Sequence, residues 1–121
     1  MFPTLARICA AVCAALAAIL LLVPNVYAVL HGVDPGPSGA FLGRRLAPLF
    51  AGLALMLWLS RDAPRSPQRQ AMCLGLALAW GGIACTGLLA FSRGEASLTV
   101  LLAGVVEAAF CGAFLLTARR D

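Results

Sequence analysis

Four long apolar runs, separated by short connections, constrain this chain more than any other feature of its sequence. They cover about residues 8–30, 41–59, 71–91 and 96–118. A helix needs roughly 20 apolar residues to cross the core of a bilayer, and all four runs meet that length, the second least comfortably. The runs are hydrophobic on all faces, which is typical of helices that face lipid. The sequence therefore predicts an all-α polytopic membrane protein, a single domain over residues 1–121 built as a four-transmembrane-helix bundle.

The composition excludes several other classes of protein. Hydrophobic residues make up 62% of the 121 residues, whereas soluble domains are only about 45–50% apolar. A soluble chain of this length cannot hide that much apolar surface. All nine basic residues are arginine and lie almost entirely at the ends of the apolar runs, so the net charge of +4 indicates membrane orientation and not nucleic-acid binding.

The connections contain residues that end and begin helices. Residues 31–43 are rich in Gly and Pro and predict a loop. Ser66 followed by Pro67 predicts a helix start, with a Ser cap and Pro in the first helical position. Gly94 suits the left-handed conformation that ends a helix, and the very short turn there predicts that the third and fourth helices are antiparallel neighbours. Pro24 is expected to bend the first helix.

The arginines also predict an orientation. If the N-terminus is cytoplasmic, six arginines lie on the cytoplasmic side and three on the outer side. Cytoplasmic loops carry an excess of basic residues, so this bias predicts a multi-pass protein with both termini in the cytoplasm. The cytoplasmic set is Arg7, Arg61, Arg65, Arg69, Arg119 and Arg120, and the outer set is Arg44, Arg45 and Arg93.

The first 28 residues admit a second interpretation. Arg7, an apolar run and then Val26-Tyr27-Ala28 also form the pattern of a secretory signal peptide with its cleavage site. The apolar run is slightly long for a signal core. Under either interpretation the other three runs remain membrane helices.

Glu107 is the most informative residue, because it is the one charge inside the fourth apolar run. A carboxylate at the bilayer centre is costly and is rare without a partner or a role. Trp80, at similar depth on the third helix, is the first predicted partner through its indole N–H. Arg44 and Arg45 are the second. Otherwise they anchor their helix at the outer interface, which we favour, or hold an anionic group there. We favour a structural role, in which a partnered Glu107 holds helices together, over that of a proton- or cation-coupling carboxylate in a transporter.

Five cysteines all fall inside apolar runs. On the predicted orientation, four of them lie toward the cytoplasmic half, and a soft-metal or thiol cluster would form there if their helix faces converge. We favour the simpler interpretation that each is a small buried apolar residue. No metal site is therefore predicted, and the weak candidates are Cys9, Cys13, Cys73 and Cys111.

Small residues at four-residue spacing predict packing faces. Gly104, Ala108 and Gly112 form such a face on the fourth helix. Ala77 and Gly81 form another on the third. Small side chains let a second helix approach closely, either within the bundle or from another chain.

The segment order resembles small bacterial inner-membrane proteins known only as four-helix domains of unknown function. Four stretches carry the resemblance: Pro24 near the end of the first run, Leu30-His31-Gly32-Val33-Asp34-Pro35, Arg44-Arg45-Leu46 within residues 41–52, and Trp58-Leu59-Ser60-Arg61. The resemblance covers nearly the whole chain and implies a four-helix bundle in a bacterial cytoplasmic membrane, but no activity. The Arg-rich, lysine-free composition separately indicates a high-GC bacterial genome.

Three functions remain open. The first expectation is a structural or accessory membrane protein that contacts itself, a larger complex and the lipid bilayer. The second is a small dimeric transporter that couples transport through Glu107. It resembles small multidrug transporters in size and helix count, although their acidic residue lies in the first helix. The third is a membrane thiol or metal-binding protein. We expect neither an enzyme nor a cofactor, because no Ser-His-Asp set, metal-ligand spacing or phosphate loop is present.

Overall fold

The computed structural model describes residues 1–120, and all of its regular elements there are helices. They are α1 (Phe2–Leu22), α2 (Pro24–Leu30), α3 (Gly36–Ser60), α4 (Pro67–Ser92) and α5 (Thr99–Ala118). The four helices other than α2 are long and apolar enough to cross a membrane. This confirms the all-α, four-transmembrane-helix architecture and adds one short helix that the sequence did not predict.

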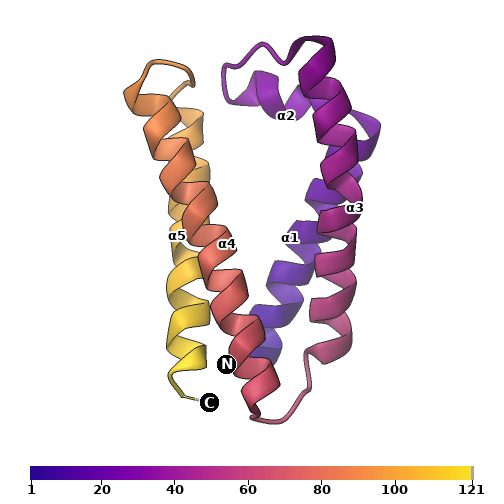
Figure 1. Cartoon of the computed structure of the whole chain (residues 1–121), viewed down its shortest axis with the longest axis vertical. Helices are drawn as coiled ribbons and strands as arrows, with labels where there is room; N and C mark the ends of the chain where they lie inside the picture. Colours follow the sequence, from indigo (N-terminus) through magenta and orange to yellow (C-terminus); the bar gives the residue numbers. More distant parts are fainter. Residues whose placement is uncertain (121) are drawn as a thin grey trace.

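The helices form two hairpins. α1 packs along α3, and α4 packs along α5, which confirms that the last two spans are antiparallel neighbours (Figure 1). The hairpins approach each other at the end that carries both termini and diverge toward the other end, where α2 lies (Figure 1). A buried core joins them, contributed by α1 (Phe2, Ala6, Cys9, Ala10, Cys13), α3 (Leu57), α4 (Cys73, Leu76, Ala77, Trp80) and α5 (Phe110, Phe114, Ala118).

Pro24 ends the first spanning helix instead of bending it. The helix stops at Leu22, and Val23 leaves the helical region with φ −136° and ψ 57°. Proline is tolerated at the first position of a helix, so α2 begins at Pro24. The predicted span of residues 8–30 is therefore corrected: the spanning helix is Phe2–Leu22, and the following residues form α2.

The other helix boundaries follow local sequence. α3 begins at Gly36, earlier than the expected 41, because Pro37 falls in the first turn, where its missing N–H costs nothing. The Ser66 side chain accepts a hydrogen bond from the Arg69 N–H at 3.2 Å, which confirms the predicted cap. Gly94 has φ +71° just beyond α4 and confirms the predicted left-handed residue.

The wide end of the molecule is bridged by hydrogen bonds between α2 and the start of α5. The Ser97 N–H donates to the His31 carbonyl at 2.8 Å, and the Thr99 hydroxyl donates to the Leu30 carbonyl. Gly32 has φ +72°, and a Cβ there would lie 2.8 Å from the Ser97 Cβ. Only glycine suits both the backbone and the contact at this point, so the bridge depends on it.

Candidate functional site

Glu107 lies near the middle of α5 and is 9% exposed. It is roughly 12 Å along the helix from Thr99 at 1.5 Å per residue. Within residues 1–120 its carboxylate makes neither a hydrogen bond nor an ion pair; both salt bridges of the described chain are formed by Asp62. A carboxylate so placed needs compensation that the described chain does not supply.

The Glu107 side chain lines a cavity of about 340 Å³ between α2, α4 and α5. The cavity walls extend from Ala96 in the α4–α5 turn down α5 to Glu107, so the carboxylate lies at the deep end. Most of the remaining wall is aliphatic, including Ile83, Val100 and Ala103. The site is therefore an apolar recess with an acidic group at its inner end.

A second cavity, of about 460 Å³, lies between α1, α2 and α3. The two cavities share Tyr27, Ala28, Val33 and Ile83, so one wall, made mainly by α2, belongs to both. Neither cavity is lined by an arginine, and the second includes Asp34. The charged groups facing the space between the hairpins are thus carboxylates.

Two aromatic rings from α2 and its C-terminal end line the same cavity as Glu107. Tyr27 and His31 contact edge to face, with ring centroids 4.8 Å apart. Burial raises the pKa of the Tyr27 phenol, and the Glu107 charge raises this pKa further, so the phenol stays neutral beside the carboxylate. The His31 Nδ1 is buried and has no hydrogen-bond partner in the described chain. The cavity therefore holds a second polar group that is not satisfied by the protein.

The partners predicted for Glu107 are occupied elsewhere. Trp80 is 5% exposed, and its ring stacks on Phe110 with centroids 4.9 Å apart. Its side chain lies beside Cys9 in the core. The depth predicted for Trp80 is close to correct, because Phe110 is one helical turn from Glu107, but the indole meets another face of α5.

Arg44 and Arg45 do not pair with Glu107 either. Both are exposed on α3, and the Arg45 guanidinium lies 5.6 Å from the centroid of the Phe41 ring. Neither residue lines either of the two cavities. The structure thus leaves these arginines on the outside of the α1–α3 hairpin.

Three of the five cysteines are buried core residues, Cys111 is half-buried and Cys85 is exposed. Cys9, Cys13 and Cys73 are fully buried in the core. Cys111 contacts α4 instead, where a Cβ on Gly81 would lie 3.0 Å from its sulfur. Among residues 1–120, no group of three or more His, Cys, Asp or Glu side chains is placed to hold a metal ion. The convergence required for a four-cysteine metal cluster is therefore not found.

The two small-residue faces have different environments. On α4, Ala77 is buried in the core and Gly81 contacts Cys111, so this face packs within the chain. On α5, a Cβ at Gly104 or Gly112 would meet nothing within 4 Å, and Ala108 is exposed. Gly104 and Ala108 also line a groove of about 350 Å³ between α4 and α5. The α5 face is therefore uncovered by the described chain.

Sequence reasoning missed Tyr27 and His31 as members of the site. Their spacing of four residues places both on one face of a helix, which was the available signal. The apolar run predicted one continuous spanning helix over residues 8–30, which placed Tyr27 inside that helix and His31 just beyond its end. The break at Val23 allows α2 to turn toward α5. The local sequence predicts a break but not the direction that α2 takes after it.

Comparisons with known proteins identify no relative. No family model matches the chain, and neither a curated protein nor a solved structure matches it. The functional proposals below therefore rest on the geometry of the chain itself.

Proposed function

We propose that this protein is a small membrane transporter that binds a lipophilic cation, or a proton in its place, at Glu107. The observation that carries the proposal is Glu107, a residue that is 9% exposed, lines an apolar cavity and has no partner for its carboxylate in the described chain. A bound cation compensates such a carboxylate, and so does protonation, so the two compete for one group. That competition is the basis of coupled transport.

The chemistry of the cavity supports a cation with an apolar body. Aliphatic walls favour the apolar part, and Glu107 pairs with the charge. The Tyr27 ring adds a face that attracts cations. No arginine in the lining would repel such a ligand.

We further propose a bacterial cytoplasmic membrane, with both termini in the cytoplasm. The support is the excess of arginines at the end of the molecule that carries the termini and the α3–α4 loop (Figure 1). In this orientation the cavity extends from the outer surface to Glu107 near the middle of the membrane. The opposite entrance would have to form by movement of one hairpin against the other, with a second copy completing the pathway.

The direct test is cation binding to the purified protein and to Glu107→Gln. The probes are tetraphenylphosphonium and the smaller benzyltrimethylammonium, titrated in detergent micelles. We expect the wild type to bind at least one probe and Glu107→Gln to bind it about thirtyfold more weakly, because loss of a buried charge partner costs 2 kcal/mol or more, roughly.

Glu95→Gln is the matched control, since it removes the same charge from an exposed position in the α4–α5 turn. It is expected to bind like the wild type. An equal loss of probe affinity in Glu107→Gln and Glu95→Gln, or no binding of either probe to the wild type, would contradict the proposal. Uptake driven by a pH gradient in liposomes then distinguishes a transporter from a protein that only binds.

A second candidate function is that of an accessory protein that associates with another transmembrane helix. The uncovered small-residue face of α5 and its groove favour it, because close helix approach in membranes depends on such faces. Under this proposal a helix of a second copy or of a larger complex packs on Gly104 and Ala108.

Gly104→Leu tests the accessory function. The added side chain meets nothing within the chain, so the protein should fold normally but lose its partner, as measured by native mass spectrometry after extraction from the membrane. Gly75→Leu is the control, because Gly75 is equally open but lies outside the groove. A partner retained by Gly104→Leu, or a monomeric wild type without a partner, would count against this function.

A further inference from the structure

The second cavity, between α1, α2 and α3, adjoins the Glu107 site. Its volume of about 460 Å³ exceeds the 340 Å³ of the Glu107 cavity. The residues that line both cavities are Tyr27, Ala28, Val33 and Ile83. Each of these residues borders both spaces, so groups bound in the two cavities would contact the same side chains.

The interruption of the first apolar run creates this arrangement. The spanning helix stops before Val23, and α2 begins at Pro24 where the hairpins diverge (Figure 1). Gly43 of α3 allows a close approach there, because a Cβ at Gly43 would lie 3.0 Å from the Pro24 Cβ. Ile83 of α4 adds the side of the other hairpin to the shared wall. The two cavities therefore flank α2.

The lining of the second cavity is mainly apolar. α1 contributes Leu16 and Leu20, and α3 contributes Leu46 and Phe50. Cavities of about 300–1,000 Å³ that are lined mainly by apolar side chains, with few polar groups, are typical of ligand sites. The second cavity therefore suits the bulky apolar part of a ligand.

The charge of such a ligand is better placed at Glu107 than at Asp34, the acidic residue of the second cavity. Asp34 is exposed to water, and its Oδ1 accepts a hydrogen bond from the Gly36 N–H at 3.2 Å. Glu107 is 9% exposed, and its carboxylate has no partner in the described chain. Water screens an exposed ion pair far more than one largely removed from water, so a cation gains more at Glu107.

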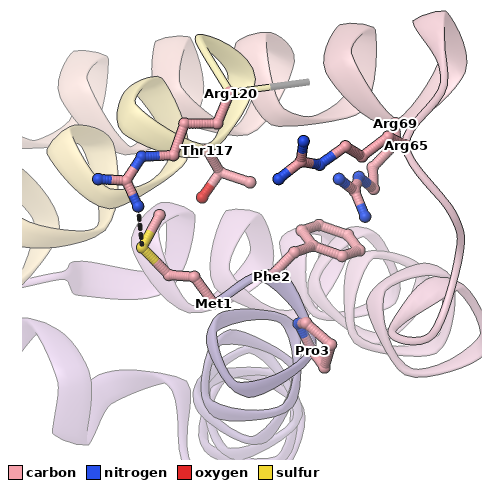
Figure 2. Close-up of a pocket in the computed structure, with 7 residues that line it drawn as sticks. All are labelled: Met1, Phe2, Pro3, Arg65, Arg69, Thr117 and Arg120. Atoms are coloured by element: carbon pink, nitrogen blue, oxygen red, sulfur yellow. Dashed lines mark hydrogen bonds between the residues drawn. The ribbon is translucent and has the colours of Figure 1, made fainter.

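Other combinations of cavity and ligand fit less well. An anionic phospholipid in the second cavity would bring its phosphate close to Asp34, with no arginine in the lining to attract it. A cavity of about 270 Å³ at the end that carries both termini is lined by Arg65, Arg69 and Arg120 (Figure 2). Guanidinium groups disfavour a cation. The two cavities that flank α2 are therefore the better match for a cationic ligand.

We propose that one ligand spans both cavities, an organic cation whose charge pairs with Glu107 and whose bulky apolar body occupies the second cavity. This inference rests on the proposed function and narrows its substrate class to cations with several large apolar groups. Tyr27 and Ile83 contact the ligand where it passes from one cavity to the other. A small cation fills the Glu107 cavity alone, so substitutions in the second cavity should affect large cations and spare small ones.

The test measures binding of a large probe, tetraphenylphosphonium, and a small one, benzyltrimethylammonium, to variants of the full chain in micelles. Leu46→Trp and Leu16→Trp each add bulk to the lining of the second cavity, from α3 and from α1. Leu49→Trp is the matched control, because Leu49 is exposed on α3 and lines neither cavity. We expect each cavity variant to bind the large probe about tenfold more weakly, because overpacking a filled site is unfavourable. The small probe should bind all three variants like the wild type.

The outcomes separate this inference from the proposed function. The inference is overturned if neither cavity variant weakens the large probe selectively, or if Leu49→Trp weakens it equally. If Glu107→Gln still weakens binding in that case, the cation site stands without the second cavity. A wild type that binds only the small probe has the same meaning. Absence of binding of either probe overturns the proposed function and the inference together.

Native mass spectrometry tests a lipid as the alternative occupant of the second cavity. A copurified phospholipid that is lost from Leu46→Trp and Leu16→Trp, but is not displaced by tetraphenylphosphonium, would identify a lipid site and overturn the inference. We expect tetraphenylphosphonium to displace any lipid that occupies the cavity. Circular dichroism confirms that each variant is helical.

Discussion

Replacing Glu107 with leucine is expected to make the protein more stable while abolishing its cation binding. Glu107 is 9% exposed and its carboxylate has no partner in the described chain, and a polar group that is largely removed from water without a partner costs about 1–3 kcal/mol. Leucine fills a comparable volume and adds contacts with the aliphatic wall of the cavity. The free energy of unfolding, measured by titration with sodium dodecyl sulfate in mixed micelles, should therefore rise by about that amount. Residues that lower the stability of the fold in this way are typical of functional sites.

Glu95→Leu provides the comparison, because Glu95 is exposed in the α4–α5 turn and its replacement should change stability by about 0.5 kcal/mol or less. A structural Glu107 would give the opposite result. If the carboxylate held α5 to another helix, Glu107→Leu would unfold more easily than the wild type. A decrease in stability would therefore contradict the proposed role.

Trp80→Ala is expected to separate the two hairpins. Trp80 is 5% exposed in the core where the hairpins meet, stacks on Phe110 of α5 and lies beside Cys9 of α1. Truncating a buried Phe or Trp in protein cores costs about 3–5 kcal/mol because of the cavity left behind. Packing of this kind drives helix association in membranes. We expect the free energy of unfolding, measured by the same detergent titration, to fall by about 3 kcal/mol or more.

Trp58→Ala is the matched control, because it removes the same side chain from the surface of the bundle. Trp58 is 50% exposed, and the Arg61 guanidinium lies 4.5 Å from the centroid of its ring. Loss of that exposed contact should cost about 1 kcal/mol or less. If Trp80→Ala is no more destabilising than Trp58→Ala, the core that joins the hairpins is not the main contact between them.

The parts of the fold that depend on local chemistry could be predicted from the sequence. Long uncharged runs require spanning helices, a serine before a proline caps α4, and a glycine after α4 adopts the left-handed conformation. Pro24 was correctly identified as a point of change, but its consequence was underestimated. A proline both restrains its own φ and disfavours helix at the preceding residue, and at Val23 the two effects ended the helix.

The candidate site depends on features that local chemistry does not determine. Residue spacing gave the depth of Glu107 and of Trp80, since each helical residue advances a fixed distance. Which faces meet depends on how the two hairpins pack on each other, and Trp80 lies in the core that joins them. For that reason the indole faces Cys9, and Glu107 faces Tyr27 of a short helix that the apolar run concealed.

Infrared difference spectroscopy of the Glu107 carboxyl group tests the central claim most directly. Spectra of the protein in lipid are recorded with and without tetraphenylphosphonium or benzyltrimethylammonium, for the wild type, Glu107→Gln and Glu95→Gln. The cation-binding account predicts a change in a carboxyl band on ligand addition that persists in Glu95→Gln and disappears in Glu107→Gln. A band that changes equally in Glu107→Gln, or no band that responds to either ligand, would contradict it.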